Sequence, residues 1–150
     1  MASDAAAGAR ILLVEDEVAI RRATTAALEA MGHSVTPAPE FDAAQALLKS
    51  ETFDLALVDL NLRGGHGGFV LMRHIRAEGF SLPIIVISST TDHEDILAAL
   101  RLGVDDFVQK PVRASELTCV VGRTLKKHRV AANSSAPGAS DAASAEEGAA

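Results

Sequence analysis

Apolar residues occur along the chain in two alternating patterns. Short runs with few polar interruptions are typical of strands that are buried on both faces of a parallel sheet. Between these runs, apolar residues recur every three or four positions, which is the spacing of one helix face. The candidate strands are 10–14, 33–36, 55–59, 83–87 and 106–109. The candidate helices are 18–31, 41–48, 69–76, 92–102 and 115–128.

The alternation of strand and helix predicts an α/β fold with a five-stranded parallel sheet and five helices. Right-handed crossover connections would place helices on both faces of the sheet, which makes the fold doubly wound. Five-stranded domains of this flavodoxin-like class commonly have the strand order 2-1-3-4-5. In that order the carboxyl ends of strands 1 and 3 lie side by side, at the switch point where such sheets bind their ligands.

Glycine and polar residues predict where several elements begin and end. Gly32 and Gly103 each follow a segment with helical periodicity and are expected to end it. Thr91 and Glu94 have the spacing of a capping box, in which two side chains accept hydrogen bonds from free backbone N–H groups, so a helix is expected to begin there. Pro37 is expected to close the weak second strand, because proline cannot donate to a sheet.

The 150 residues correspond to one domain. We divide the chain into a disordered leader (1–8), a folded domain (9–129) and a disordered tail (130–150) that is rich in Ala, Ser and Gly. The net charge is −6, and without the three acids of the tail it is about −3. The domain therefore has no basic surface of the kind that binds DNA directly.

The cysteine content and the hydropathy indicate where the protein resides. The single cysteine, Cys119, excludes an internal disulfide and favours a reducing compartment. It lies beside core positions of the last helix and is expected to be a buried structural thiol. The chain has no run of the roughly 18–20 apolar residues that a membrane span needs, and its N-terminus lacks the pattern of a signal peptide. We therefore expect a cytoplasmic protein.

Polar residues follow four of the predicted strands, and all of them would lie at one edge of the sheet. Glu15 and Asp16 follow the first strand, Asp59 ends the third, Ser88 follows the fourth, and Lys110 follows the fifth. A buried aspartate is uncommon unless it is paired or bound to a metal. Asp59 alone could equally cap the glycine-rich loop behind it, but five converging side chains favour a functional site.

The chemistry of these residues suits phosphoryl transfer. Three carboxylates in one crevice repel each other, so a cation is expected among them. Oxygen ligands without His or Cys favour Mg²⁺ or Mn²⁺, which Asp16, Asp59 and the backbone carbonyl of Asn61 could hold. An aspartate can attack phosphorus to form an aspartyl phosphate. Lys110 and Ser88 would then neutralise the charge on the transferring phosphoryl group.

In these residues and their positions, the chain resembles the CheY-like receiver domain of two-component response regulators. The resemblance extends from about Arg10 to His128. It implies that Mg²⁺ supports phosphorylation of an aspartate. By this resemblance Asp59 is the phosphoacceptor, and Ser88 and Lys110 contact the phosphoryl group. The metal is held by Asp16, by Asp59, by the backbone carbonyl of Asn61 and, through a water molecule, by Glu15. Ser88 and Phe107 form the pair of residues that switches on phosphorylation.

The resemblance also implies how the protein acts. The phosphoryl donor is a phosphohistidine on a sensor histidine kinase or a histidine phosphotransfer protein. The receiver is not an enzyme with a separate substrate, since it catalyses only its own phosphorylation and dephosphorylation. Phosphorylation changes the face formed by family helix 4, strand 5 and helix 5, which here comprises 96–102, Phe107 and 113–121. That face binds a downstream effector protein or a second copy of the domain. The Lys110–Pro111 bond is expected to be cis.

Three functions remain open on the sequence. The favoured one is a stand-alone phosphoacceptor switch that signals by binding proteins. A phosphorelay shuttle would instead return the phosphoryl group to a histidine partner, and a pseudo-receiver scaffold would act without phosphorylation. The complete set of acids, hydroxyl and lysine argues against the scaffold. An aspartyl hydrolase is disfavoured because Asn61, rather than a second acid, stands two residues after Asp59. The chain could also be a fragment of a longer regulator.

Two features depart from the family pattern. Arg63 replaces a proline that is common after the third strand, and the glycine-rich loop around His66 is one residue longer than is typical. These departures concern the loop and leave the proposed acceptor unaffected. His66 itself is expected to be an exposed loop histidine.

Overall fold

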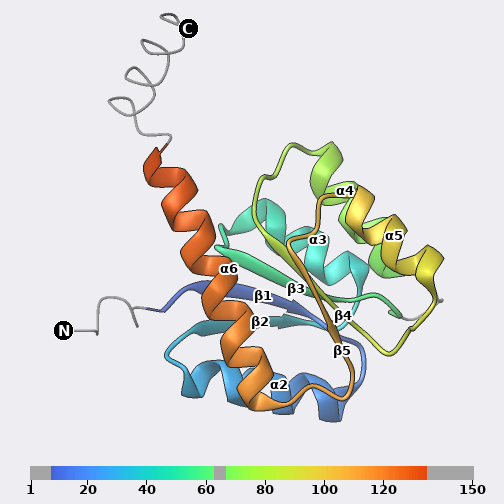
Figure 1. Cartoon of the computed structure of the whole chain (residues 1–150), viewed down its shortest axis with the longest axis horizontal. Coiled ribbons are helices and arrows are strands. Elements are labelled where there is room, and N and C mark those ends of the chain that lie inside the picture. Colours follow the sequence, from blue (N-terminus) through green and yellow to red (C-terminus); the bar gives the residue numbers. More distant parts are fainter. Residues whose placement is uncertain (1–7, 63–66, 135–150) are drawn as a thin grey trace, which may run out of the picture.

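The computed structural model describes residues 8–62 and 67–134. In this part of the chain five parallel strands form one sheet in the order β2-β1-β3-β4-β5, with helices on both faces (Figure 1). This confirms the predicted doubly wound α/β fold. The strands are β1 (Arg10–Val14), β2 (Ser34–Ala38), β3 (Leu55–Asp59), β4 (Ile84–Ser88) and β5 (Asp106–Gln109). The helices are α2 (Val18–Ala30), α3 (Phe41–Ser50), α4 (Gly67–Ala77), α5 (His93–Arg101) and α6 (Ala114–Ser134).

Successive residues of the central strands point to opposite faces of the sheet, and each face has its own hydrophobic core. Leu12 and Val14 of β1 belong to the core beneath α3, α4 and α5, whereas Ile11 and Leu13 belong to the core beneath α2 and α6. The strands β3 and β4 alternate in the same way. Because both faces are covered, these strands are apolar at nearly every position rather than at every second one.

The glycines expected to end two helices have the left-handed conformation that such ends require. The φ angle is 95° at Gly32 and 76° at Gly103, and each N–H is bonded to a carbonyl of the preceding helix turn. On α6 five residues at helical spacing are buried and form its core face: Leu117, Val120, Val121, Thr124 and Leu125.

The last helix is longer than the sequence pattern predicted. It continues to Ser134, so residues 130–134 are helical rather than part of a disordered tail. The apolar period ends near residue 125, but the alanines at 131 and 132 have the highest helix propensity and prolong the helix beyond its packed part. The rest of the expected leader and tail (1–7 and 135–150) lies outside the described residues, as do Arg63 and His66.

Three local predictions are wrong. The strand β2 passes through Pro37, which is tolerated because β2 is an edge strand with a neighbour on one side only. Asp92 rather than Thr91 is the N-cap of α5, where its side chain accepts a hydrogen bond from the Glu94 N–H at 2.9 Å. Cys119 is exposed, since it lies on the solvent side of α6 next to buried positions.

Candidate functional site

The residues singled out at the strand ends meet at one edge of the sheet. The pairing of β1 with β3 places Glu15 beside Asp59. The pairing of β3 with β4, and of β4 with β5, brings Ser88 and Lys110 to the same edge. The connection that follows Lys110 contains the expected cis bond to Pro111. The strand order alone therefore assembles side chains from four separate segments of the chain.

Three carboxylates of this edge converge. Oxygen atoms of Glu15, Asp16 and Asp59 lie within 4.8 Å of one another. Glu15 and Asp59 are 1% and 2% exposed, so little water is available to offset their mutual repulsion. Burial, and then the charge of Asp59, raises the pKa of Glu15. Such a set of hard oxygen donors fits a divalent cation of the Mg²⁺ type.

Lys110 lies between two of these acids. Its Nζ is 3.1 Å from Oε1 of Glu15 and 3.1 Å from Oδ2 of Asp59. Burial by itself lowers the pKa of Lys110, but Asp59 and then Glu15 outweigh that effect, so the pKa is raised and the ammonium form is favoured. One ammonium against three carboxylates leaves the cluster negative, which supports a place for a cation.

The second oxygen of Asp59 is also held. The backbone N–H of Asn61 donates to Oδ1 of Asp59 at 3.0 Å, while Lys110 binds Oδ2. The carboxylate is thus oriented by a backbone donor from the loop that follows it and by the ammonium of Lys110, the residue after β5. A positioned carboxylate of this kind can act as a nucleophile toward phosphorus.

Ser88 is completely buried at the end of β4 and has both a donor and an acceptor partner. Its Oγ donates to Oδ1 of Asn61 at 3.0 Å and accepts from the Thr90 N–H at 3.0 Å. The sequence assigned Asn61 a metal-binding role through its backbone carbonyl, and it predicted no hydrogen-bond partner for the Asn61 side chain. The contact of its side chain with Ser88 was missed, because it joins the loop after β3 to the end of β4, 27 residues away.

Phe107, the expected switch aromatic, lies on β5 opposite Val86, two residues before Ser88 on the neighbouring strand. It is partly buried against the core beneath α3, α4 and α5. Beside the acidic cluster, a hollow of about 490 Å³ opens between α2 and the connection from β5 to α6. Apolar residues make up most of its wall, with Lys110 at one side: Ala19, Ile20, Ala23, Pro111 and Val112.

Comparison with known proteins identifies the family. Residues 11–121 match the family model described as the response regulator receiver domain. The chain belongs to this receiver family. The predicted resemblance is thereby confirmed, and so is the assignment to two-component signalling. The receiver family acts as a signalling switch and uses Mg²⁺, in agreement with the acidic cluster.

Curated relatives of this receiver are longer proteins. The chain is 32% identical to the two-component response regulator PhoP of Pseudomonas aeruginosa, over 79% of this chain and 52% of PhoP. It is 31% identical to the phosphate regulon transcriptional regulatory protein PhoB of Escherichia coli, over 79% of this chain and 52% of PhoB. The chain thus spans about half the length of these relatives.

Solved structures agree with the fold. A CheY-like receiver domain protein from Methanospirillum hungatei has a TM-score of 0.76 at 27% identity, over 81% of this chain and 97% of that one. NtrX from Brucella abortus has a TM-score of 0.80 at 32% identity, over 85% of this chain and 30% of NtrX. Among the helices of the described residues, none combines the length and the hydropathy required to cross a bilayer.

Proposed function

We propose that the domain is a phosphoacceptor switch and that Asp59 receives its phosphoryl group from a phosphohistidine of a sensor kinase or a histidine phosphotransfer protein. One observation carries this proposal. The Asp59 carboxylate is buried, oriented by Lys110 and by the Asn61 N–H, and surrounded by two further acids. This combination is costly for stability, and phosphoryl transfer uses each of its parts.

The transfer requires one bond to form and one to break. A carboxylate oxygen of Asp59 attacks phosphorus, the bond from phosphorus to the imidazole nitrogen breaks, and its electron pair stays on that nitrogen. A carboxylate nucleophile needs no general base. Lys110 then pairs with the negative charge of the aspartyl phosphate, and Ser88 can donate its hydroxyl proton to a phosphoryl oxygen.

The acidic cluster would hold Mg²⁺ through Asp16, Asp59 and the Asn61 carbonyl, with Glu15 acting through water. When bound, the metal ion supplies positive charge to the phosphoryl oxygens. The same acids explain why uptake of the phosphoryl group should need the metal. Without the metal ion, the negative charge of three carboxylates, offset by one ammonium, would repel the incoming phosphoryl group.

The apolar hollow beside the site is where we expect the histidine partner to dock. It is lined by Ile20 of α2 and by Pro111 and Val112 behind Lys110. A partner helix seated there would bring its phosphohistidine to the edge of the sheet. Burial of apolar surface would stabilise the complex, while Lys110 at the rim attracts the phosphate charge.

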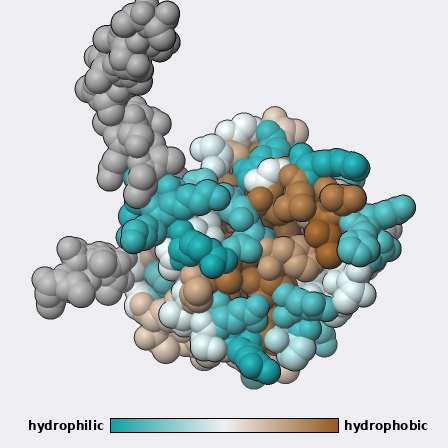
Figure 2. All heavy atoms as spheres, viewed as in Figure 1, coloured by the Kyte–Doolittle hydropathy of each residue, from teal (hydrophilic) through white to brown (hydrophobic). Residues whose placement is uncertain are grey.

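The output face is formed by α5, β5 and α6. Leu97 and Leu100 of α5 are 48% and 51% exposed although both are large and apolar. Figure 2 shows hydrophobic side chains gathered on this side of the molecule, among polar ones. Such a patch with a polar rim is typical of a protein-binding surface. We expect it to bind a downstream effector or a second copy of the domain.

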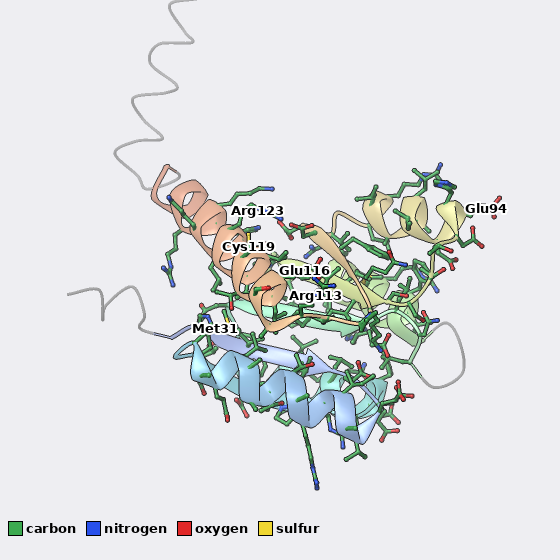
Figure 3. The ribbon with its side chains drawn as sticks, turned by 60° about the horizontal axis from the view of Figure 1, so that its bottom comes forward. Met31, Glu94, Arg113, Glu116, Cys119 and Arg123 are labelled. Carbon is green, nitrogen blue, oxygen red and sulfur yellow. The ribbon has the colours of Figure 1, made fainter. Side chains whose placement is uncertain are left out.

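Charged residues of α6 border this output face. Glu116 and Arg123, with Cys119 between them, lie along one side of α6 toward β5, and Arg113 lies just before the first residue of this helix (Figure 3). Nη2 of Arg123 is 2.6 Å from Oδ2 of Asp106 on β5, and this pair is largely exposed. Because it is exposed, this ion pair contributes little to the stability of the fold. We propose instead that it helps to determine which protein binds the output face.

The experiment that tests the proposal is the intact mass of the protein after incubation with acetyl phosphate and Mg²⁺. Wild type should gain one phosphoryl group, and Asp59→Asn, which keeps the size of the side chain, should gain none. Transfer from a phosphorylated kinase is the second donor test. No gain with either donor, when Mg²⁺ binding has been demonstrated, would contradict the proposal and favour the scaffold. Rapid return of the group to a phosphotransfer protein would identify a shuttle.

A further inference from the structure

The hydroxyl group of Ser88 has a single proton, and that proton is already in use. It is donated to Oδ1 of Asn61 at 3.0 Å, while the oxygen of the hydroxyl accepts from the Thr90 N–H at 3.0 Å. A serine hydroxyl can donate only one hydrogen bond. The proposed function requires the same proton at a phosphoryl oxygen on Asp59. The two arrangements therefore exclude each other.

Asn61 is well placed to hold this arrangement. Its backbone N–H is bonded to Oδ1 of Asp59, so the loop that carries Asn61 is fixed to the phosphoacceptor. Ser88 is completely buried whereas Asn61 is exposed, so the Asn61 oxygen reaches the buried hydroxyl from the solvent side of the site. Breaking the contact without a new acceptor would leave a buried donor unsatisfied.

A chain of hydrogen bonds continues from Ser88 to α5. Thr90, whose N–H is bonded to Ser88, donates its hydroxyl proton to Oδ2 of Asp95 at 3.1 Å. The same hydroxyl accepts from the N–H of Asp92, the N-cap of α5, at 3.1 Å. The segment that carries Ser88 is therefore tied to the first turn of the helix that carries the exposed Leu97.

We propose that the Asn61 side chain is a positioning residue that holds the Ser88 hydroxyl away from the phosphoryl group in the unphosphorylated domain, and that Thr90 transmits its release to α5. This inference rests on the proposed function. Phosphorylation supplies a charged acceptor, which binds a hydroxyl more strongly than an amide oxygen does. Ser88 then exchanges acceptors, and the change in its position reaches α5 through Thr90 and Asp95.

The test uses the whole chain with saturating Mg²⁺ and beryllofluoride, which binds an aspartate as a phosphoryl group does without being transferred. Affinity is measured by NMR titration in wild type, Asn61→Ala, Ser88→Ala and the double variant. Asn61→Ala should bind beryllofluoride roughly two- to tenfold more tightly than wild type, the effect of removing one competing hydrogen bond. In the Ser88→Ala background the Asn61 substitution should have no effect, because no hydroxyl remains to be held.

A merely structural role of Asn61 predicts a different result. Loss of packing would weaken beryllofluoride binding, and it would do so equally with and without the Ser88 hydroxyl; either finding would overturn the inference. A Mg²⁺ titration of each variant without beryllofluoride separates effects on the metal from effects on the hydroxyl. If wild type takes up neither acetyl phosphate nor beryllofluoride, both proposals fail. If wild type takes up both and Asn61→Ala has unchanged affinity, only the inference about Asn61 fails.

The link to α5 is tested with Thr90→Val, which keeps the shape of the side chain but loses the hydroxyl. This variant should still bind beryllofluoride, while the amide shift changes in α5 should be smaller than in wild type. Thr91→Val is the matched control, since Thr91 is the exposed neighbour, and it should respond as wild type does. Undiminished shift changes in Thr90→Val would show that the signal reaches α5 by another route.

Discussion

The ammonium group of Lys110 lies 3.1 Å from the carboxylate of Asp59, although 51 positions separate the two residues along the chain. Their contact arises because β3 and β5 run parallel and end at the same edge of the sheet. Lys110 also lies 3.1 Å from Glu15, so it balances two buried acids at once. It is followed directly by the connection to α6. A change of charge on Asp59 therefore acts on a residue that is joined to the output face.

We expect Lys110→Ala to separate phosphorylation from switching. Uptake of the phosphoryl group from acetyl phosphate should persist but slow by roughly 10- to 1,000-fold, since one of the groups that stabilise the transferring charge is lost. The amide shift changes on α5, β5 and α6 that accompany phosphorylation should be largely lost. Both are measured by mass spectrometry and NMR on the same sample. Lys126→Ala, an exposed lysine of α6, is the control, and full switching by Lys110→Ala would contradict the role given to Lys110.

Glu15→Gln should stabilise the metal-free protein at neutral pH. Burial and Asp59 raise the pKa of Glu15 above 4.5, so the folded state binds this proton more tightly than the unfolded state does. The stability that wild type gains from protonated Glu15 is fully present below pH 4.5, and it is lost as the pH rises through the pKa of Glu15 in the folded state. The advantage of Glu15→Gln over wild type, measured by urea denaturation, should therefore shrink as the pH falls toward 4.5. An advantage that does not depend on pH would contradict this account.

Magnesium should favour the stability of wild type over that of Glu15→Gln. With a cation in the cluster, the charge of Glu15 becomes favourable, so Mg²⁺ should raise the melting temperature of wild type more than that of Glu15→Gln. Thermal unfolding with and without Mg²⁺ measures the difference. Equal shifts in the two proteins would show that Glu15 has no part in holding the metal.

Gly68→Ala should destabilise the fold, because α4 packs against the end of β3 without room for a side chain. A Cβ at Gly68 would lie 2.5 Å from the backbone oxygen of Asp59 and 2.7 Å from Cα of Leu60. We expect a loss of about 1–3 kcal/mol, the usual cost of overpacking. Gly122→Ala in α6 is the control, since nothing lies within 4 Å of its Cβ position. There alanine should gain about 0.5–1 kcal/mol of helix stability. Equal effects in urea denaturation would contradict the packing argument.

Arg76 joins three segments at the end of the sheet opposite to the site. Its guanidinium donates to four backbone carbonyls, which belong to the turn after α4 and to the turn after α5: those of Phe80, Leu82, Leu102 and Gly103. Arg76→Met should lower the free energy of unfolding by about 2–4 kcal/mol, because four carbonyls, of which only that of Gly103 is exposed, lose a charged donor. Arg73→Met, on the exposed side of α4, should change it by less than about 0.5 kcal/mol. A similar effect of the two substitutions would refute this role.

The sequence by itself determined the architecture. Continuous apolar runs such as 55–58 predict a strand covered on both faces, and the structure places its successive residues in two different cores. The strand order is the one that five-stranded sheets of this kind commonly have, and it predicts that acids, hydroxyl and lysine meet at one edge. These inferences succeed because burial and backbone geometry depend on local pattern and on general rules of chain connection.

Other features were decided only by the tertiary structure. The sequence placed Cys119 next to buried residues, but each step along a helix turns by about 100°, so only the orientation of α6 on the sheet decides that Val120 is buried and Cys119 is not. The bond from Ser88 to Asn61 likewise joins the end of β4 to the loop after β3, and its formation depends on ångström-scale positions set by the packing of both strands. Hydrogen bonds require a defined distance and direction, whereas the hydrophobic effect is non-directional and depends on the apolar area that is buried. The pattern of residues therefore determined which segments meet, and the folded backbone determined which atoms bind.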